Sequence, residues 1–390
     1  MDNVYEKALA LHKEHKGKIA VNTKVDVVNK DDLSLVYSPG VAEPCREIAK
    51  DPAAAYDYTI KGNTVAVISD GSAVLGLGNI GPMAAIPVME GKAMLFKMFA
   101  DIDAFPICLN TQDTDDIVRT IRNIAPVFGG INLEDFSAPR SFEIESRLQD
   151  LGIPVFHDDQ HGTAIVVLAA LINAAKVVEK NINDLTIVIN GAGAAGIAIA
   201  KLLKGIGLKN PAVSVKNIIL CDSKGVIHTG RTDLTDAKLA SLMYSNPNNV
   251  TGGVKDALHG ADVFVGVSVA NLLTADDIRT MAPRSIVLAL ANPDPEIVPD
   301  EAHRGGAMVV GTGRSDYKNQ VNNVLGFPGV FRGALDARAP KITPNMKLAA
   351  ALAIAECVEH PSPDYIIPAS LDKEVALRVA AAVKAAAEQE

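Results

Sequence analysis

The sequence has 390 residues, of which 48% are hydrophobic, 21% charged and only 4% aromatic, with a net charge of −9. This length accommodates two hydrophobic cores, and the composition is typical of a globular protein. An acidic chain without a basic cluster argues against nucleic acid or an anionic membrane as a partner. The four cysteines form no CxxC pair, which argues against a zinc ribbon or a dithiol site and favours reduced thiols.

The N-terminal segment, MDNVYEKALALHKEHKGK, is interrupted by charges throughout. It therefore predicts an amphipathic surface helix rather than a signal peptide, and we expect a cytoplasmic protein. The most apolar predicted helix, residues 163–178, is too short for a membrane span and is expected to be a buried core helix.

Along the chain, short apolar runs alternate with helical patterns, which is typical of parallel α/β sheets. The predicted strands are residues 64–70, 105–110, 129–135, 153–159, 186–193, 217–223, 261–268, 285–292 and 307–313. We expect two α/β domains: an N-terminal substrate and metal domain, residues 1–162, and a C-terminal Rossmann-type parallel sheet, residues 163–390. The helical stretch at the end of the sequence is expected to pack back on the first domain.

Two stretches match the pattern GxGxxG, at residues 191–196 and 76–81. Only the stretch with Gly191, Gly193, Ala194, Ala195 and Gly196 follows an apolar strand directly, opens a small-residue helix and precedes a second strand that ends in an acid, Asp222. This context predicts a dinucleotide site, with the phosphates at the helix N-terminus. The other stretch is better explained as glycine-rich turns near a substrate cleft.

Asp222 is expected to accept the ribose hydroxyls and to disfavour a 2′-phosphate, while Lys224 would offset that repulsion. The sequence therefore predicts NAD as cofactor and leaves NADP possible.

Two predicted strands end in paired acids, Glu134 with Asp135 and Asp158 with Asp159. If these strands are parallel neighbours, four carboxylates converge on one sheet edge, where their mutual repulsion favours a divalent cation. An all-oxygen ligand set suits Mg²⁺ or Mn²⁺, and a set of solvated helix-capping acids is the alternative. His157 and His161 flank the acids, and we expect them to support the site rather than bind the metal.

Tyr37 and Lys92 form the candidate proton-transfer pair. Lys92 is predicted near a helix start, where partial desolvation beside a metal would let it act as a base, with the Tyr37 phenol as the acid. Lys97 competes with Lys92 for the role. Taken singly, a tyrosine or a lysine such as Tyr37 and Lys92 is more often a surface or packing group.

The ordered motifs LVYSPGVAEPC, SDGSAVLGLGNIGPMAAIPVMEGKAMLFK, INLEDF, FHDDQHGTA, NGAGAAGIA, ANPDPE and NNVLGFPG resemble the malic enzymes, in their short bacterial form, over nearly the whole chain. The resemblance implies oxidation and decarboxylation of (S)-malate to pyruvate with NAD(P)⁺ and a divalent metal, and we expect a homodimer. It implies Glu134, Asp135 and Asp159 as metal ligands, Asp158 as the support of the base Lys92, Tyr37 as the acid, and Asn292 and Asn323 as substrate and nicotinamide contacts.

One departure from the longer malic enzymes concerns the segment 69–77, which lacks their substrate-binding arginine. The metal, Asn292, Asn323 and the backbone amides near residues 38–41 are the candidate partners of that substrate carboxylate. The sequence also ends before the acyltransferase-like extension of some bacterial relatives. A malolactic or oxaloacetate-decarboxylating activity, a nucleotide-sensing regulator and a metal-dependent hydrolase are the alternative functions.

Overall fold

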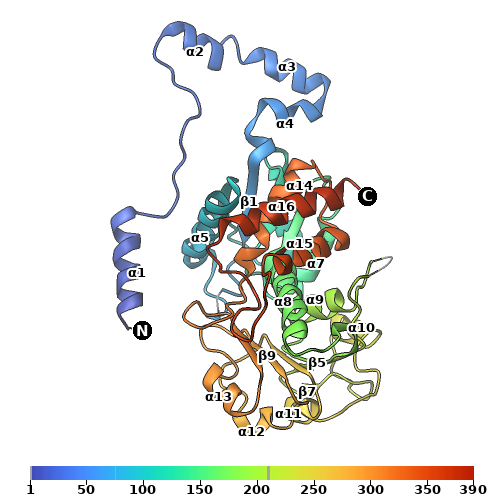
Figure 1. The fold of residues 1–390 in the computed structure, drawn as a ribbon. Coiled ribbons are helices and arrows are strands. Elements are labelled where there is room, and N and C mark those ends of the chain that lie inside the picture. The colour runs from blue at the N-terminus through green and yellow to red at the C-terminus, as the bar shows by residue number, and fades with distance from the viewer. Residues whose placement is uncertain (1, 75, 209–210) are drawn as a thin grey trace.

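A computed structural model describes residues 2–74, 76–208 and 211–390, which form two β-sheets surrounded by helices (Figure 1). The first sheet has the order β2-β1-β3-β4 and is parallel throughout. Its strands are β1 (Thr64–Ser69), β2 (Asp103–Cys108), β3 (Gly130–Leu133) and β4 (Val155–His157). The second sheet has the order β10-β9-β8-β5-β6-β7. Its strands are β5 (Thr186–Asn190), β6 (Asn217–Asp222), β7 (Gly225–Val226), β8 (Val263–Gly266), β9 (Ile286–Ala289) and β10 (Val309–Thr312).

The nine predicted strands are all present, and the predicted α/β class with a Rossmann-type second sheet is confirmed. β7 was not predicted, because its two residues are too few to show an alternating pattern. It pairs antiparallel with the end of β6, while the other neighbouring strands described in the second sheet are parallel.

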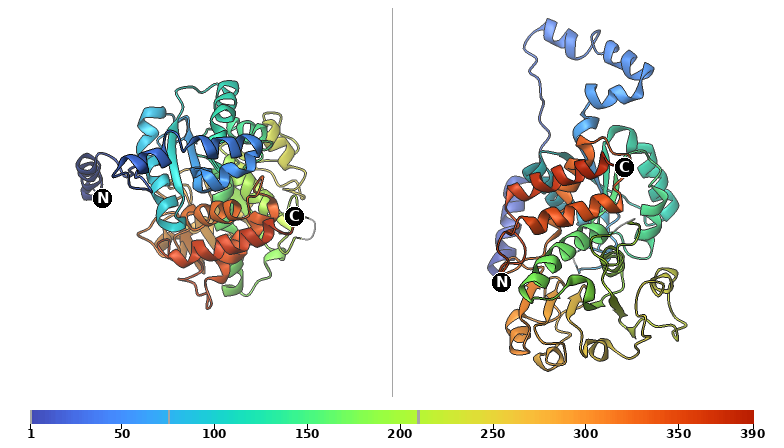
Figure 2. Two further views of the ribbon diagram at one scale, coloured as in Figure 1. Left: turned by 90° about the horizontal axis from the view of Figure 1, so that it is seen from above. Right: turned by 45° about the vertical axis from the view of Figure 1, so that its right-hand side comes forward.

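The helices lie mainly on the faces of the two sheets (Figure 2). In the first half of the chain they are α1 (Asp2–His15), α2 (Lys30–Val36), α3 (Ala42–Lys50), α4 (Ala55–Tyr58), α5 (Pro82–Ala100), α6 (Thr114–Ile124), α7 (Arg140–Arg147) and α8 (Asp158–Val177). In the second half they are α9 (Ala194–Leu203), α10 (Asp236–Ser241), α11 (Val254–Leu258), α12 (Ala275–Ile278), α13 (Pro299–Arg304), α14 (Phe327–Asp336), α15 (Pro344–Glu356) and α16 (Lys373–Ala387).

Helix α8 begins at Asp158, immediately after β4, rather than at Thr163 as the sequence pattern indicated. The first turn therefore contains Asp158 and Asp159, whose negative charge is favourable at a helix N-terminus. Among the described helices, α8 alone is long and apolar enough to cross a membrane by those two measures. Most of it is buried in the core between the two sheets, as expected for a core helix.

The C-terminal helix α16 packs against α5 of the first sheet, as the sequence pattern indicated, and α14, which precedes that stretch, does so too. Phe96 of α5 lies edge-to-face against Phe327 and Phe331 of α14, with ring centroids 4.8 and 5.3 Å apart. Such aromatic pairs add about 0.5–1.5 kcal/mol each beyond the burial of their area. This packing fixes the short 3₁₀ turn Asn323–Leu325, which precedes α14, beside the carboxyl edge of the first sheet.

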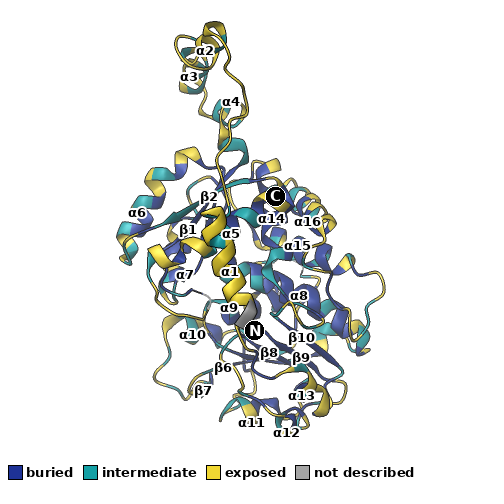
Figure 3. Ribbon diagram, turned by 90° about the vertical axis from the view of Figure 1, so that its left-hand side faces the viewer, coloured by how far each residue is buried: buried dark blue, intermediate teal, exposed yellow. Residues whose placement is uncertain are grey.

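Residues 19–54 project from this body as an arm that carries α2 and α3 (Figure 1). No residue of the arm is buried, and Figure 3 shows it exposed or half-exposed along its length. The preceding residues are anchored differently, because Lys18 donates from Nζ to the Pro87 carbonyl of α5, at 2.6 Å.

Candidate active site

The three predicted metal ligands lie together where β3 and β4 end. These strands are parallel neighbours with Leu133 opposite His157, so that the residues following them meet at one edge. Glu134, Asp135 and Asp159 each place a carboxylate oxygen within 4.8 Å of the others. The Asp135 amide also donates to Asp159 Oδ2, at 2.8 Å, from a left-handed backbone with φ of +57°. Such strained backbone in a non-glycine residue is concentrated at functional sites.

Burial and mutual repulsion both act against ionisation of this cluster. Burial, only partly offset by Lys92, raises the pKa of Glu134 and of Asp158 to about 7. Burial also raises the pKa of Asp159 to about 6, and the charge of Asp158 adds to the effect. A divalent cation would relieve this repulsion, and the hard oxygen donors are those that Mg²⁺ and Mn²⁺ prefer. The residues therefore fit the predicted metal.

Lys92 faces the acids from the middle of α5, not from its start as predicted. Its ammonium lies 2.6 Å from Asp158 Oδ2 and 2.9 Å from Glu134 Oε1, and its side chain is only 8% exposed. Burial lowers the pKa of Lys92, but the charges of Asp158 and Glu134 outweigh it and leave the pKa raised. Lys97, the competing candidate, is exposed and pairs with Asp101 and Asp103 instead of the buried acids.

Asp158 is fully buried, contacts Lys92 and is not one of the three acids that lie together. Its Oδ2 also accepts from Asn323 Nδ2, at 2.6 Å, although 165 residues separate the two in sequence. Its Oδ1 has no hydrogen-bond partner among the described residues. Asp158 thus contacts both Lys92 and Asn323, and its supporting role stays a prediction.

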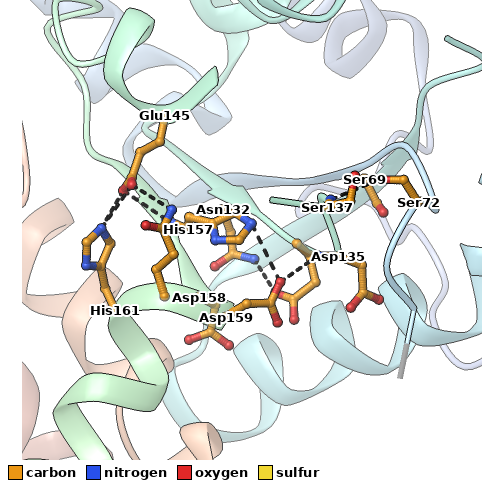
Figure 4. A network of polar contacts seen from close by, with 12 residues as sticks. Ser69, Ser72, Asn132, Asp135, Ser137, Glu145, His157, Asp158, Asp159 and His161 are labelled. Atoms are coloured by element: carbon orange, nitrogen blue, oxygen red, sulfur yellow. Dashed lines mark hydrogen bonds and ion pairs between the residues drawn. The ribbon is translucent and has the colours of Figure 1, made fainter. Parts of the chain in front are cut away.

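The two flanking histidines lie near the carboxyl edge of the first sheet, where Glu145 is their neighbour (Figure 4). His157 Nε2 lies 3.6 Å from Asp159 Oδ2, and burial lowers the pKa of His157 to about 4, so that its ring is neutral. His161 Nε2 contacts Glu145 at 2.8 Å. The three-acid group found among the described residues contains neither histidine.

One cleft joins the acid cluster to the second sheet. It has a volume of about 740 Å³, and its lining includes Lys92, Glu134, Asp135, Asp159, Asn292 and Asn323 together with Ala195 of the glycine-rich turn. Gly76 of the other GxGxxG stretch also lines it, as expected for turns near a substrate cleft. The structure thus brings Lys92, the acids and both asparagines to one space.

The three glycines of the 191–196 stretch have separate structural roles. A Cβ on Gly191, whose φ is +115°, would lie 2.4 Å from the Val267 carbonyl oxygen, and one on Gly196 would lie 2.1 Å from that of Gly191. A Cβ on Gly193 would meet no atom within 4 Å, so this position faces open space at the start of α9. A dinucleotide-binding turn requires a glycine for the tight turn, a second that leaves the backbone open to the pyrophosphate, and a third where the helix packs closely on the strand.

Asp222 ends β6 as predicted and lines a second cleft of about 980 Å³. Its carboxylate accepts from Arg231 at 2.8 Å and Lys238 at 2.5 Å. Although burial opposes ionisation, these hydrogen bonds hold the pKa of Asp222 at about 2. Lys224 does not offset Asp222 with its side chain, which pairs with Asp233. Arg231 and Lys238 were not singled out from the sequence, because neither lies in the glycine motif.

Tyr37 does not reach this cleft within its own chain. It is 68% exposed on the arm, and the backbone of residues 38–41, a predicted carboxylate partner, lies there with it. His12 and Lys18 also line the cleft. They were not predicted from the sequence, because no motif surrounds them. Arg140, near the segment without the family arginine, is already bound to Asp70 at 2.7 Å.

Comparison with known proteins identifies the family of this chain. Residues 15–149 match the N-terminal domain of malic enzyme, and residues 160–388 match the malic enzyme NAD binding domain. The chain belongs to the malic enzyme family. It is 56% identical to the bifunctional malic/malolactic enzyme of Bacillus subtilis, over 98% of this chain and 92% of that protein. It is 54% identical to the NAD-dependent malic enzyme of Geobacillus stearothermophilus, over 99% of this chain and 79% of that protein.

A solved malic enzyme has the same fold. The crystal structure of the NAD-dependent malic enzyme of Thermotoga maritima superposes with a TM-score of 0.92 at 50% identity, and the match covers 97% of this chain and 98% of that one. Because so little of this chain is left out, most of the arm must be included in the match. The arm is therefore largely included in the fold that the two proteins share.

Proposed function

We propose that this protein oxidises and decarboxylates (S)-malate to pyruvate and CO₂, reducing a nicotinamide dinucleotide in the presence of Mg²⁺ or Mn²⁺, in the cytoplasm. The observation that carries the proposal is the single cleft in which Lys92, the three acids and Ala195 of the glycine-rich turn meet. A nucleotide sensor would need neither the buried lysine nor the acids. A metal-dependent hydrolase would have no use for the dinucleotide turn.

The predicted residues have separate proposed roles in the cleft. Glu134, Asp135 and Asp159 would hold the cation, and the turn at Gly191–Gly196 would hold the dinucleotide phosphates at the start of α9. When bound, the cation supplies Lewis-acid polarisation of the C2 oxygen, and the nicotinamide accepts the hydride. Asn292 and Asn323 would orient the substrate and nicotinamide from the cleft wall.

Lys92 would take the C2 hydroxyl proton as hydride leaves C2. It must be neutral to do so, whereas Asp158 and Glu134 raise its pKa. Neutralising Glu134 and its neighbours with a cation weakens that effect, and the burial of Lys92 then lowers its pKa toward the working range of a base. Once CO₂ has left, C3 of enolpyruvate needs a proton, which we assign to the Tyr37 hydroxyl.

The proposed cofactor preference is a modest one for NAD⁺. Asp222 at the end of β6 suits a free ribose hydroxyl and repels a 2′-phosphate. Arg231 and Lys238 already neutralise that carboxylate, which keeps the preference small.

Malolactic activity is a second candidate for the same site, because the relative from Bacillus subtilis is named a bifunctional malic/malolactic enzyme. The two activities differ in whether NADH accumulates. The test is to measure initial rates with malate against NAD⁺ and NADP⁺, each with Mg²⁺ and Mn²⁺. Reduced nicotinamide and pyruvate in equal amounts would support the proposal. Lactate without NADH would replace it with the malolactic reaction, and no turnover of malate would refute both.

A further inference from the structure

The cleft beside the acid cluster is rich in negative charge, although malate itself carries two carboxylates. Three acids and three basic side chains are among its lining residues: Glu134, Asp135, Asp159, His12, Lys18 and Lys92. The Lys92 ammonium already contacts Asp158 at 2.6 Å and Glu134 at 2.9 Å, so it is not free to pair with a further anion. A dicarboxylate therefore needs another cation on the cleft wall, and Lys18 is the candidate.

Lys18 reaches the cleft from the turn that follows α1, and this turn is fixed to α5. The Lys18 backbone amide donates to Glu90 Oε2 at 3.2 Å, and its Nζ donates to the Pro87 carbonyl at 2.6 Å. A Cβ on Gly17, whose φ is +118°, would lie 2.9 Å from Glu90 Oε1, so a glycine is needed for this close approach. Both ends of the Lys18 residue are thus held on the helix that carries Lys92.

The Lys18 ammonium lies on the face of α5 that borders the cleft. The α5 residues that line the cleft share one side of the helix: Pro87, Val88, Gly91, Lys92 and Leu95. A Cβ on Gly91 would lie 3.7 Å from Lys18 Nζ, so the ammonium lies beside the residue that precedes Lys92. Lys18 and Lys92 are therefore two cations on the same wall, one free to face a ligand and one bound to the buried acids.

The contacts of the Lys18 ammonium leave it able to bind an anion. Nζ has three N–H donors, and its acceptors are the Pro87 carbonyl and His12 Nε2, at 2.6 and 2.7 Å. His12 Nδ1 lies 2.7 Å from the Ala8 carbonyl, which can only accept, so Nε2 is the acceptor nitrogen of that ring. Within the part of the chain that the structure describes, no carboxylate forms an ion pair with Lys18 Nζ. Burial lowers the pKa of Lys18, and a bound anion would offset this effect.

We infer that Lys18 binds the C1 carboxylate of the substrate. This inference rests on the proposed function. The C4 carboxylate loses its charge as it leaves as CO₂, so a cation paired with it would stabilise malate more than the transition state of decarboxylation. The C1 carboxylate keeps its charge from malate to pyruvate and can stay paired throughout. Lys18 therefore stabilises each bound state to a similar extent, which lowers KM and leaves kcat nearly unchanged.

Steady-state kinetics of Lys18→Met test this assignment, because methionine keeps the aliphatic stem and removes the charge. The KM for malate should rise about 10–100-fold, as expected for loss of a charged hydrogen bond, while kcat stays within about twofold of the wild type. Lys18→Arg, which restores the charge, should recover part of the affinity. Lys13→Met removes the same charge from an exposed position on α1 and should behave as the wild type. A fall in kcat at unchanged KM would overturn the inference.

Equilibrium binding separates the inference from the proposed function and identifies the carboxylate. Malate is titrated into the protein with Mn²⁺ and NADH, and pyruvate into the protein with Mn²⁺ and NAD⁺, since no hydride can be transferred in either mixture. Calorimetry should show both acids weakened by a similar factor in Lys18→Met, with unchanged affinity for NADH. Weakening of malate alone would assign Lys18 to the C4 carboxylate, and equal affinities in variant and wild type would show no contact; either result overturns the inference alone. A wild-type protein that binds neither acid would overturn the proposed function and this inference with it.

Discussion

The carboxyl edges of the two sheets differ in how far their acidic side chains are neutralised by neighbouring basic groups. At the first edge, Glu134 and Asp158 contact the buried ammonium of Lys92, and Asp135 and Asp159 lie close to Glu134. At the second edge, Asp222 is matched by Arg231 and Lys238, and the turn beside it is made of glycine and alanine. Ionisation is resisted at the first edge, whereas the pKa of Asp222 is held at about 2.

The difference indicates which kind of ligand each sheet edge is suited to bind. A group of buried acids that one lysine compensates only in part is stabilised by protons or by a further cation, so the first edge is suited to a metal. A charge-balanced edge with exposed backbone amides can receive a ligand through the helix N-terminus without a metal. Changes at the first edge should therefore affect metal binding and chemistry, and changes at the second should affect the choice of dinucleotide.

The largest effect is expected from Asp159→Ala. Removing one of three ligands should lower kcat by at least about 10²-fold through loss of the metal, since even outer contacts of metal sites commonly contribute 10–100-fold. NADH binding, followed by fluorescence, should be unchanged because the glycine-rich turn is untouched. Asp115→Ala, an exposed acid on α6, is the control. A variant with near-normal turnover would show that Asp159 is not a ligand.

Lys92→Ala should block oxidation of malate by about 10²–10⁴-fold, as expected for loss of a general base. Lys97→Ala is the matched control five residues away on the same helix and should remain active, because its ion pairs are exposed. Supplying oxaloacetate with NADH separates reduction to malate from decarboxylation to pyruvate. Loss of oxidation in Lys97→Ala with normal Lys92→Ala activity would reverse the assignment.

Mn²⁺ should raise the melting temperature of the wild-type protein more at pH 8 than at pH 5.5. The folded pKa values of Glu134 and Asp159 are raised to about 7 and about 6, so their protonated forms stabilise the metal-free fold at low pH. That contribution is lost as the pH rises through these values, while the carboxylates become free to bind metal. Asp159→Ala should show little shift at either pH, and an equal wild-type shift at both would contradict the ligand assignment.

The smallest effect is expected at the second edge. Asp222→Ala removes the repulsion of a 2′-phosphate and frees Arg231 and Lys238, so kcat/KM should shift toward NADP⁺ by about tenfold, or ~1.4 kcal/mol. The wild type should show its modest preference for NAD⁺ in the same assay. Asp262→Ala, which removes an ion pair with Lys180 outside the clefts, should leave the ratio unchanged. An unchanged ratio in Asp222→Ala would place the ribose elsewhere.

The sequence by itself determined the local architecture. Buried strands read as apolar runs, and the spacing of Gly191, Gly193 and Gly196 marked one strand–turn–helix unit among two similar patterns. The acids after β3 and β4 were found because parallel neighbours end at the same edge, which is a consequence of backbone pairing alone. The family motifs added the expected roles.

Only the tertiary structure decided which side chains meet. Lys92 and Lys97 lie on one helix, and the packing of α5 turns the first toward Asp158 and the second toward solvent. Asn323 reaches Asp158, and Arg231 and Lys238 reach Asp222, through contacts that no local pattern encodes. Tyr37 was placed on the exposed arm rather than beside Lys92, because the position of a side chain depends on packing between distant segments.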